Sequence, residues 1–564
     1  MTRFTLPVTL KVRGATITRS SSIGAVGIDA SMAKRKFGAT GERYYLPGRL
    51  VKGLLREAWQ ELGTVKPEYA GYITEWLGVG SGEDYNEPLR GRLYFSDFAD
   101  DKPATARLRY RISIDEDTGA ADAGMLQVME SPYAPLQEVE FSGEVRCLTG
   151  AGENVQPVLE AVQRGLLWVR AVGGARTSGF GELRYVVCGA PEQPAKKPAV
   201  APEQDSVWEY RISFSEPVIL SKRRISDNLF ESGDVIPGGA LKGAVADMIR
   251  REPLAYQQLL DELHAVRFTH GFPTKDGKRP QWRPLSVMLT DQGKLVNALD
   301  VEDNLDGSFD IDWKDQEKEK ANAEYPWPEV PWELRVRTAI DSKLRKTDEG
   351  ALFAWQMLDP TDFQWVGQVE TSRISDAARA QLRDLLSFGV EPIGKTKALG
   401  TVDLFEPRRA GARAYPTYTV TLETPCLLID PGNSLTSAED LQAEYGRVWR
   451  ELSDGSLRLI GNKYFQRCSL AGGEYYWRRF SRQRGKYWPY LLTDAGSTFR
   501  LQVEAGKEAQ AGEYLGRWLT HGLPISPWVL RFYGIPPDLK NMWQHCPYLP
   551  ENGYGEIHVG EFHV

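Results

Sequence analysis

Long hydrophobic runs are missing from this sequence, because no apolar stretch approaches the roughly 20 residues that a membrane-spanning helix needs. The first residues, Met1 to Gly14, alternate apolar and polar side chains like a β-strand. They contain neither the apolar block nor the cleavage site of a signal peptide. We therefore expect a cytoplasmic protein with no membrane partner.

Cysteine and histidine are also scarce. The five cysteines are scattered singly, with no CxxC pair and no histidine at zinc-ligand spacing. This pattern predicts neither a disulfide framework nor a structural zinc. The six histidines form no recognised metal or triad spacing, so we expect no histidine-based catalysis.

The sequence has no overall positive charge, since its net charge is -7. This value argues against a protein that coats nucleic acid with its whole surface but leaves room for local basic channels. The strongly charged segment Asp300 to Lys320 is poor in apolar residues and is expected to be an exposed insertion.

What the sequence does have is an internal repeat of four elements in the same order. A Pro-Gly turn leads into a Lys-Gly helix start, an Arg-rich strand ends in Ile-Asp, a short strand contains a glycine, and a glycine-rich basic loop follows. The first copy reads YYLPGRLVKGLLREAW (44–59), RYRISID (109–115), FSGEV (141–145) and GGARTSGFGELR (173–184). The second reads DVIPGGALKGAVADMI (234–249), RVRTAID (335–341), WVGQV (365–369) and IGKTKALGTVDL (393–404). We interpret this as a tandem duplication of one domain.

Composition suggests where the domains end. The segment 189–205 is rich in Pro, Ala and charge without periodicity, which is typical of a linker. The sequence predicts a first domain over 1–188, a second over 206–407 and a diverged, related domain over 408–564. Alternating strands and helices with glycine-rich connections favour α+β domains, of which the ferredoxin-like (RRM-like) arrangement most often presents a sheet to RNA.

The glycine-rich loops have two possible readings. Glycines let backbone amides approach a phosphate closely, with Arg176 supplying charge in the first loop and Lys395 and Lys397 in the second. Each loop alone could instead be a tight turn that needs positive φ. Their recurrence favours phosphate binding.

The helix starts are equally ambiguous. Lys52 and Lys242 lie in the first turn of their helices, where a cation opposes the helix dipole unless an anion is the true partner. The alternative is a simple turn followed by a solvated lysine. We favour the anion site in both copies.

IPGGALKG, YLPGRLVKG and GGARTSGFG together resemble the signature elements of the RAMP superfamily, the RNA-binding proteins of CRISPR interference complexes. The resemblance covers about Met1 to Pro407 as two copies and the third segment more faintly. It implies tandem ferredoxin-like RAMP domains in a type III effector, of a fused, III-D-like kind. The implied partners are the crRNA, a target RNA, a large polymerase-like subunit, other RAMP subunits and a small subunit.

In this family, backbone subunits cleave the paired target RNA with an aspartate placed before the Pro-Gly turn. Gly27 to Asp29 matches the family's Gly-Ile-Asp motif, which implies a catalytic Asp29 that also binds Mg²⁺ or another divalent cation. An aspartate suits this role because the attacking 2′-OH belongs to the RNA. By residue type alone, an Asx-turn role is the more common one.

The second copy lacks Gly-Ile-Asp. Asp227 is the candidate for a second cleaving residue, whereas Asp234 lies so close to the turn that we expect it to cap the helix. The three cations just upstream, Lys222 to Arg224, are expected to contact the guide backbone.

The segment from Arg109 to Gly143 resembles the family's extended hairpin, a thumb that inserts between guide and target. Arginines alternate along the strands, which could form a phosphate track or simply an exposed sheet face. Met125 is either a wedge or a core residue, and Leu126 is expected in the core. In the third domain, Tyr475 to Tyr490 interleaves arginines with aromatics, which suits base stacking and phosphate neutralisation.

The residues expected to contact RNA are Lys52, Arg56, Arg109, Arg111, Gly173, Gly174, Arg176, Gly179, Lys222, Arg223, Arg224, Lys242, Arg335, Arg337, Lys395, Lys397, Arg478 and Arg479. A purely structural RNA-binding subunit and a cap-type subunit that holds the 5′ tag of the crRNA remain alternatives. A free-standing guide-processing nuclease is disfavoured, because such enzymes usually want a histidine near the N-terminus and the first one here is His264.

Overall fold

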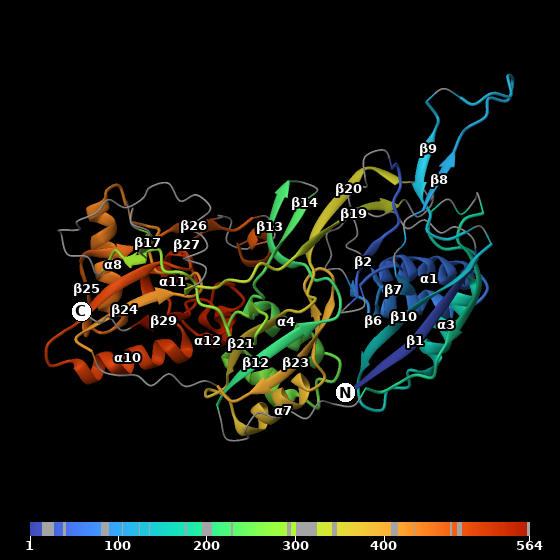
Figure 1. The fold of residues 1–564 in the computed structure, drawn as a ribbon. Coiled ribbons are helices and arrows are strands. Elements are labelled where there is room, and N and C mark those ends of the chain that lie inside the picture. Colours follow the sequence, from blue (N-terminus) through green and yellow to red (C-terminus); the bar gives the residue numbers. More distant parts are fainter. Residues whose placement is uncertain are drawn as a thin grey trace.

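The computed structural model describes residues 1–13, 28–37, 41–79, 89–103, 105, 107–122, 124–134, 136–174, 176, 179–194, 206–226, 229–289, 295–299, 324–340, 347–407, 415–433, 435–473, 476–481 and 488–560. Three sheet-and-helix units follow one another along the chain and lie in a row in space (Figure 1). We call them unit 1 (β1 to β11), unit 2 (β12 to β23) and unit 3 (β24 to β29).

Unit 1 is built on a mixed set of long and short strands with two main helices. Its elements are β1 (Thr2–Arg13), β2 (Lys34–Lys36), β3 (Glu42–Leu46), α1 (Gly48–Gly63), α2 (Glu68–Tyr72), the π-helix η2 (Ile73–Leu77), β4 (Gly78–Val79), β5 (Leu89–Arg90), β6 (Leu93–Phe95), β7 (Phe98–Pro103), β8 (Leu108–Arg111), β9 (Gln127–Glu130), β10 (Glu138–Thr149), α3 (Gln156–Trp168) and β11 (Glu182–Cys188).

Unit 2 repeats this plan and adds a second, four-stranded sheet, β13-β14-β20-β19. Its elements are β12 (Val207–Phe214), β13 (Leu220–Ser226), β14 (Leu229–Gly233), α4 (Gly238–Ile249), α5 (Gln257–Glu262), the 3-10 helix η4 (Leu263–Ala265), β15 (Arg267–Phe268), β16 (Phe272–Thr274), β17 (Val287–Leu289), β18 (Leu295–Asn297), β19 (Trp332–Ile340), β20 (Thr347–Leu358), β21 (Gln364–Glu370), α7 (Asp376–Leu386), β22 (Val390–Ile393) and β23 (Ala398–Phe405).

Unit 3 has the smallest central sheet and several short helices. Its elements are β24 (Thr417–Leu422), α8 (Ala438–Leu452), β25 (Leu457–Phe465), β26 (Cys468–Ala471), the π-helix η5 (Trp477–Ser481), β27 (Tyr490–Thr493), β28 (Thr498–Val503), α10 (Glu508–His521), α11 (Pro527–Phe532), α12 (Leu539–Met542), the 3-10 helix η7 (Pro550–Asn552) and β29 (Ile557–Gly560).

The same strand order recurs in all three central sheets. It is β11-β1-β10-β6 in unit 1, β23-β12-β21-β15 in unit 2 and β29-β24-β28-β25 in unit 3, with every pair antiparallel. In chain order, the four strands of each central sheet and the two main helices of the unit follow one another as strand, helix, strand, strand, helix, strand. This is the ferredoxin-like arrangement, so the predicted α+β fold class is confirmed.

Side-chain patterning explains why these segments form these elements. Leu6, Val8, Leu10 and Val12 alternate along β1 and are buried, as expected for a strand with one face on the core. Pro47 precedes the first residue of α1, which then buries one apolar stripe that includes Leu55. Each unit has its own buried apolar cluster.

The units also pack against one another. Leu148, at the end of β10 in unit 1, is fully buried in the hydrophobic cluster of unit 2. Leu539 of unit 3 packs against the same cluster. We call the contact between units 1 and 2 the first seam and the contact between units 2 and 3 the second seam. Among the described residues, no helix is both long and apolar enough to cross a membrane.

Candidate nucleic-acid interface

Asp29 is fixed at the base of a projecting hairpin. Its carboxylate Oδ2 accepts a hydrogen bond from the backbone amide of Val128 in β9 at 2.6 Å, and its own amide donates to the Val128 carbonyl at 2.8 Å. The next residue, Ala30, forms a parallel bridge with Met129. Asp29 remains exposed to solvent. Asp29 is therefore fixed to the hairpin, and its carboxylate is exposed to solvent.

A divalent cation at Asp29 would need most of its ligands from elsewhere. Among the described residues, no three His, Cys, Asp or Glu side chains gather to hold a metal ion. Mg²⁺ is commonly bound by one or two carboxylates together with substrate phosphates and water. The single carboxylate of Asp29 fits such an ion only when phosphate oxygens of an RNA supply further ligands.

Strand register shows what unit 2 carries at the position of Asp29. In unit 1, Ala30 aligns with Met129; in unit 2, Phe230 aligns in the same parallel sense with Trp355. The partners correspond because Arg109 opposes Met129 and Arg335 opposes Trp355. The residue before Phe230 is Leu229, which therefore occupies the place of Asp29. Asp227 lies outside the described residues and stays a prediction.

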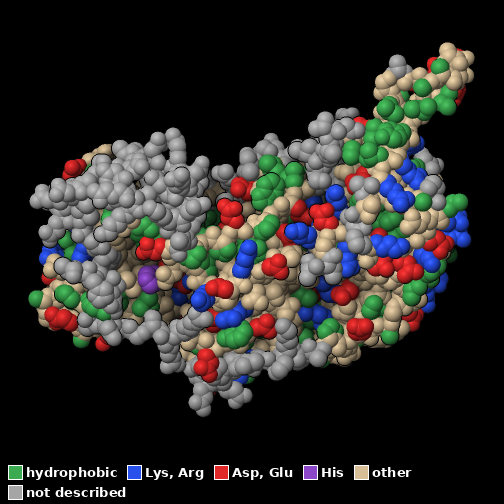
Figure 2. Space-filling model, in the orientation of Figure 1, with side chains coloured by type: hydrophobic (Ala, Val, Ile, Leu, Met, Phe, Trp, Pro, Cys, Tyr) green, Lys and Arg blue, Asp and Glu red, His purple; other side chains and the backbone are tan. Residues whose placement is uncertain are grey.

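The β8–β9 hairpin projects from unit 1 and carries exposed apolar side chains (Figures 1 and 2). Met125 and Leu126 are 59% and 58% exposed, so the expectation that Leu126 lies in the core is wrong. The hairpin extends away from its sheet, and among the described residues no other element covers its tip. The exposed apolar residues of the hairpin are Leu108, Tyr110, Ile112, Ile114, Met125 and Leu126.

The two arginines of β8 have different neighbours. Arg109 donates to the backbone carbonyl of Tyr133 at 3.0 Å. Arg111 is exposed, and its guanidinium lies 5.8 Å from the ring centre of Phe180. Arg111 is thus exposed along the hairpin, whereas Arg109 is bonded to the hairpin base.

Arg335 of unit 2 is buried in the first seam and not on an open strand face. Its guanidinium forms ion pairs with Asp97 of unit 1 at 3.0 Å and with Glu333 at 2.6 Å. Arg35 also pairs with Asp97, at 3.2 Å. This buried network binds the two units together. The side chain of Arg337 lies outside the described residues.

The first seam also holds a cluster of cations, which we call the first-seam cluster: Arg49, Lys52, Arg56, Lys395 and Lys397. It forms where the Pro-Gly helix start of unit 1 meets the glycine-rich loop of unit 2. Arg49 donates to the backbone carbonyl of Lys395 at 2.7 Å, and its guanidinium lies 4.3 Å from the ring centre of Trp355. Lys52 donates to the carbonyl of Leu93 at 3.2 Å.

The pKa of Lys52 reflects the charges of this cluster. Burial and, to a smaller extent, the neighbouring cations Lys397, Arg56 and Arg49 together lower the pKa of Lys52 to about 7. The charged groups that shift it are all of its own sign. Within the part of the chain that the structure describes, positive charge therefore accumulates around Lys52 with no carboxylate among the groups that shift its pKa, which favours binding of an anion.

The side chain of Arg56 contacts the end of η2. Its guanidinium donates to the carbonyls of Leu77 and Gly78, at 3.2 and 2.8 Å. Burial lowers its pKa. Arg56 therefore adds charge to the cluster while its donors hold the end of η2.

The second seam is built from the same parts but is filled by protein groups. Lys242 donates to the carbonyls of His264 and Val266, both at 2.9 Å. The pKa of Lys242 is lowered to about 8, because burial and Arg373 outweigh the opposite effect of Glu551 in unit 3. A Cβ placed on Gly238 would lie 2.7 Å from the Asn552 carbonyl oxygen, so unit 3 covers this helix start directly.

The first backbone amide of α1 and that of α4 also donate their hydrogen bonds to different groups. The amide of Gly48 donates to the Asp97 carboxylate at 3.0 Å, and the amide of Gly238 donates to Nδ1 of His270 at 3.2 Å. Burial lowers the pKa of His270 to about 3, so the imidazole is neutral. Asp234 does not cap α4 as expected, since Pro237 holds the N-cap position and His270 receives the first amide. Its carboxylate accepts a hydrogen bond from the Trp327 indole at 2.7 Å.

The glycine-rich loop of unit 1 is open where it is described. Gly173 and Gly179 adopt positive φ values of 86° and 79°, and a Cβ on Gly179 would meet no atom within 4 Å. Arg176 is exposed and pairs with Glu57 at 3.3 Å. Gly174 lies in the same bend.

The remaining predicted contacts fall on β13, on η5 and in the glycine-rich loop of unit 2. Lys222, Arg223 and Arg224 fall on β13, and Arg478 on η5, but their side chains are outside the described residues. Arg479 is exposed, with its guanidinium 5.4 Å from the ring centre of Phe480 and 5.9 Å from that of Trp543. Lys395 lies 3.4 Å above the Phe230 ring, and Lys397 adopts a positive φ of 58°.

Sequence reasoning missed two residues of the first seam. Arg49 directly follows the Pro-Gly turn and crosses to unit 2, a role that its place in the motif could have suggested. The Asp97 carboxylate pairs with Arg35 and Arg335 and accepts a hydrogen bond from the Gly48 amide. In the sequence, however, it lies between two short strands and belongs to no motif. No local pattern in the sequence distinguishes it from the exposed aspartates of the chain.

The fold and this seam define a class of protein: tandem ferredoxin-like units joined through a Pro-Gly helix start and a glycine-rich loop. Residues 22–184 match the family model of the RAMP superfamily. The match falls in unit 1 and agrees with the family that the resemblance implied.

Solved structures give weaker likenesses. A chain from a Type IV-B CRISPR complex shares 14% identity with a TM-score of 0.25, covering 35% of this chain and 95% of its own. A chain from the Type III-B Cmr-beta complex bound to cognate target RNA shares 13% identity with a TM-score of 0.31, covering 52% of this chain and 86% of its own. No curated protein matches the sequence.

Proposed function

We propose that this chain is a crRNA-binding RAMP subunit of a type III CRISPR effector. It forms part of the protein backbone along the guide and cleaves guide-paired target RNA through Asp29. The other partners in this proposal are a large polymerase-like subunit, further RAMP subunits and a small subunit. The III-D-like subtype remains part of the proposal.

The observation that carries RNA binding is the first-seam cluster. Several cations converge at the start of α1, and Lys52 is buried among charges of its own sign. Such an arrangement costs free energy unless an anion joins it. A ribose-phosphate backbone supplies anions at regular spacing and reaches Lys52 and Lys397 together.

The observation that supports cleavage is the exposed carboxylate at the hairpin base. Asp29 is held in place by Val128, so its position is fixed relative to any RNA that follows the hairpin. In the proposed step, the 2′-oxygen of the target RNA bonds to the adjacent phosphorus and the bond to the 5′-oxygen breaks. Asp29 accepts the 2′-OH proton, and water protonates the leaving 5′-oxygen. A bound divalent cation would be held by Asp29 and phosphate oxygens and would neutralise charge at that phosphate.

RNA binding is tested by comparing equivalent lysines in the two seams. In Lys52→Gln and Lys397→Gln, guide affinity falls and the salt dependence of binding weakens by about 0.7 per lost phosphate contact. Lys242→Gln is the matched control, because its ammonium already bonds two carbonyls in a covered seam. Equal losses in all three variants would contradict a phosphate site in the first seam.

Cleavage is tested with the assembled complex, a labelled complementary RNA and Mg²⁺. Asp29→Asn keeps an oxygen to accept from Val128 but removes the negative charge, so we expect one cut to disappear while guide binding persists. Asp117→Asn, an exposed residue at the hairpin tip, is the control. Asp227→Ala in the same gel tests the second copy. Retention of every cut in Asp29→Asn would end the cleavage proposal.

A second candidate is a subunit that holds RNA without cutting it, including the cap-type role at the 5′ tag. The register of unit 2 favours it, because Leu229 stands at the place of Asp29 and one of two related hairpins has no carboxylate there. An unchanged cut pattern with intact guide binding would establish this role.

A further inference from the structure

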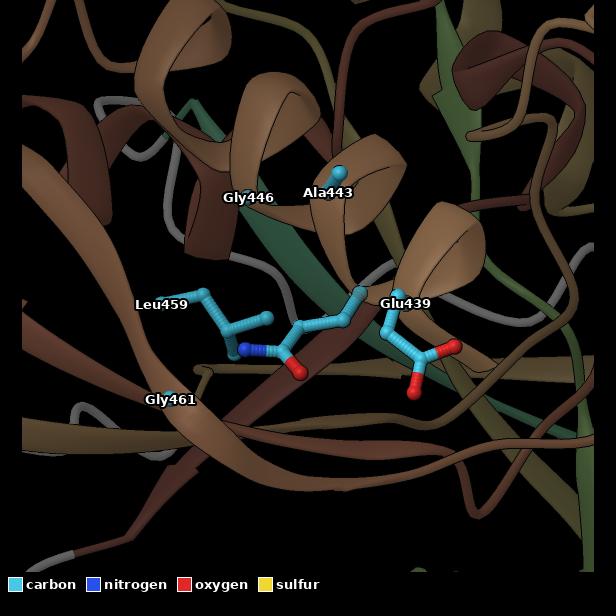
Figure 3. Close-up of a pocket in the computed structure, with 6 residues that line it drawn as sticks. Glu439, Ala443, Gly446, Leu459 and Gly461 are labelled. Atoms are coloured by element: carbon cyan, nitrogen blue, oxygen red, sulfur yellow. The ribbon is translucent and has the colours of Figure 1, made fainter. Parts of the chain in front are cut away.

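The start of α8 in unit 3 lies beside a hollow of about 310 Å³, which we call the α8 hollow. Its lining residues come from α8 and β25 and are Glu439, Gln442, Ala443, Gly446, Leu459 and Gly461. Figure 3 shows the labelled residues of α8 on one side of the hollow and those of β25 on the other. Glu439, Ala443 and Gly461 are exposed, so the hollow opens to solvent.

An irregular strand and two glycines keep this space open. The register of β25 with β28 shifts between Leu459 and Tyr464, so the residues between them bulge out of the ladder. A Cβ placed on Gly446 or on Gly461 would meet no atom within 4 Å. Glycine in the middle of a helix lowers its stability by about 1 kcal/mol relative to alanine. The fold therefore leaves this space open, although filling it from Gly446 would stabilise α8.

The α8 hollow occupies the place in unit 3 that the first-seam cluster has in unit 1. The helices α1 and α8 begin at Gly48 and Ala438, and they contact the equivalent strands β6 and β25. Counted from these first residues, three cations of the cluster correspond to residues of the hollow: Arg49 to Glu439, Lys52 to Gln442 and Arg56 to Gly446. A place that carries three positive charges in unit 1 thus carries one carboxylate and one amide in unit 3.

The polar groups of the hollow are not used by the fold. Among the described residues, neither the Glu439 carboxylate nor the Gln442 side-chain amide forms a hydrogen bond or an ion pair. The capping box of α8 uses the carboxylate of the next residue, Asp440. The hollow therefore offers a negative acceptor beside an amide that can both donate and accept. Because the carboxylate repels phosphate, a ligand of this hollow must present hydrogen-bond donors.

Among the RNA bases, guanine matches these groups best. Its Watson–Crick edge carries two neighbouring donors, N1–H and the N2 amino group, followed by the acceptor O6. A carboxylate can accept from both donors while an amide donates to O6. Adenine, cytosine and uracil each place an acceptor next to the donor on this edge, so a carboxylate there meets repulsion. Unpaired RNA bases are commonly recognised by this edge.

The shape of the hollow also suits a single base. Pockets for small ligands begin at about 300 Å³, so this hollow has room for one ring system and little more. Gly446 and Gly461 carry no side chains, so a planar ring can approach the backbone of α8 and of β25 closely. Leu459 adds an apolar surface for the ring. A flexible arginine side chain of another protein would satisfy the carboxylate but would not use this planar space.

We infer that the α8 hollow binds one guanine base by its Watson–Crick edge. Glu439 accepts from N1–H and from the N2 amino group, Gln442 donates to O6, and Leu459 packs against the ring. The base belongs to a single-stranded part of an RNA or to a free nucleoside. This site reads base identity, whereas phosphate contacts carry no sequence information. The inference depends neither on target cleavage nor on phosphate binding in the first seam.

The first test measures binding of short labelled oligouridines to the full-length protein. The probes are identical except for one central base, which is guanine, hypoxanthine, adenine or uracil. We expect the guanine probe to bind at least about tenfold more tightly than each of the others, a difference of 1.4 kcal/mol. Hypoxanthine is the sharpest comparison, since it lacks only the N2 amino group. Guanine affinity equal to that of hypoxanthine or of uracil would overturn the inference.

Two variants locate the preference in the hollow. Glu439→Gln removes the charge that accepts from guanine, and Gly446→Leu fills the space without losing helix propensity, so its thermal midpoint should not fall. Both should abolish the guanine preference and leave affinity for the uracil probe unchanged. Glu451→Gln, at the exposed far end of α8, and Gly516→Leu, on the exposed side of α10, are matched controls that keep it. A preference that survives in either test variant would contradict the site.

Competition identifies the source of the base. Guanosine displaces the guanine probe at a similar concentration if the ligand is a free nucleoside, and only at a much higher one if the base is part of an RNA. Displacement by N-acetylarginine amide where guanosine has no effect would place a protein arginine in the hollow and overturn the inference. Lys52→Gln lowers the affinity of all probes without changing their order, so this site and the proposed function can fail separately.

Discussion

Lys52 and Lys242 hold equivalent places in α1 and α4 but meet different charges across their seams. Lys52 faces Lys397, while Lys242 faces Glu551. A cation beside a carboxylate is partly neutralised, and a cation beside another cation holds its proton weakly. At the scale of single residues, the two lysines therefore differ in what they can bind at neutral pH.

The proton affinity of Lys52 gives a prediction for pH dependence. Its pKa is about 7 in the free protein, and a bound phosphate raises that pKa. Binding above pH 7 thus takes up a proton, so guide affinity falls as pH rises from 7 to 9. Lys52→Arg removes this dependence because arginine stays charged. Binding isotherms at several pH values measure the effect, and an identical pH dependence in wild type and Lys52→Arg would contradict it.

Asp97 gives a prediction for acid stability. Burial acts to raise the pKa of this carboxyl, but Arg335 and Arg35 outweigh burial and leave the pKa below its ordinary value. The stabilisation is therefore complete above about pH 4 and is lost as pH falls through the folded pKa. Asp97→Ala leaves both arginines and the Gly48 amide without this carboxylate, and it should lower the free energy of unfolding by about 3–5 kcal/mol. Urea unfolding at pH 7 and at about pH 2 measures the loss, with Asp117→Ala as the exposed control.

At the scale of elements, the helix start of α4 is defined by close backbone contacts. A Cβ on Gly238 would lie 1.9 Å from the Phe268 carbonyl oxygen and 2.7 Å from that of Asn552, whereas one on Gly243 of the same helix meets nothing within 4 Å. The first glycine therefore permits the approach of both β15 and unit 3. The second glycine has no packing role.

This contrast predicts opposite effects of the same substitution. Gly238→Ala should destabilise the protein by about 1–3 kcal/mol or more, because backbone atoms must move apart. Gly243→Ala should stabilise it by up to about 1 kcal/mol through helix propensity. Thermal unfolding of both variants measures the difference. A neutral Gly238→Ala would mean that the second seam opens without cost.

How far the sequence predicts these elements depends on the range of the contacts involved. The Pro-Gly helix starts, the glycine-rich loops and the ferredoxin-like class rest on local patterns, and they could be predicted. The exposure of Leu126 could not, because a hydrophobic residue in an alternating segment does not reveal whether another layer packs over it. The pairing of Arg335 with Asp97 joins residues from different units and leaves no periodic signal.

At the scale of the whole molecule, the two seams use equivalent positions with different charges. Arg146 of β10 pairs across the first seam with Glu216 at 3.4 Å, and Glu370 of β21 pairs across the second seam with His521 at 3.1 Å. Register makes Arg146 and Glu370 equivalent, since they oppose Tyr94 and Arg267. Each unit is therefore matched to its own neighbour.

This matching predicts a charge-reversal pattern. Glu216→Arg places two cations together in a buried seam and should cost about 3–5 kcal/mol. Adding Arg146→Glu restores an ion pair and should recover part of that loss, which a double-mutant cycle on unfolding free energies measures. The exposed pair Arg164–Glu160 is the control, where reversal costs less than about 1 kcal/mol. Additive losses at Arg146 and Glu216 would show that the pair does not join the units.

The accumulation of cations around Lys52 has a consequence for how the row of units can be assembled. Two separate proteins with such a surface between them would repel and would also lose translational freedom on binding. Here residues 189–205 join the two units covalently, so their encounter is intramolecular. Covalent connection thus lets the first seam keep a charge that free subunits would have to neutralise, and it fixes the ratio of the units at one to one.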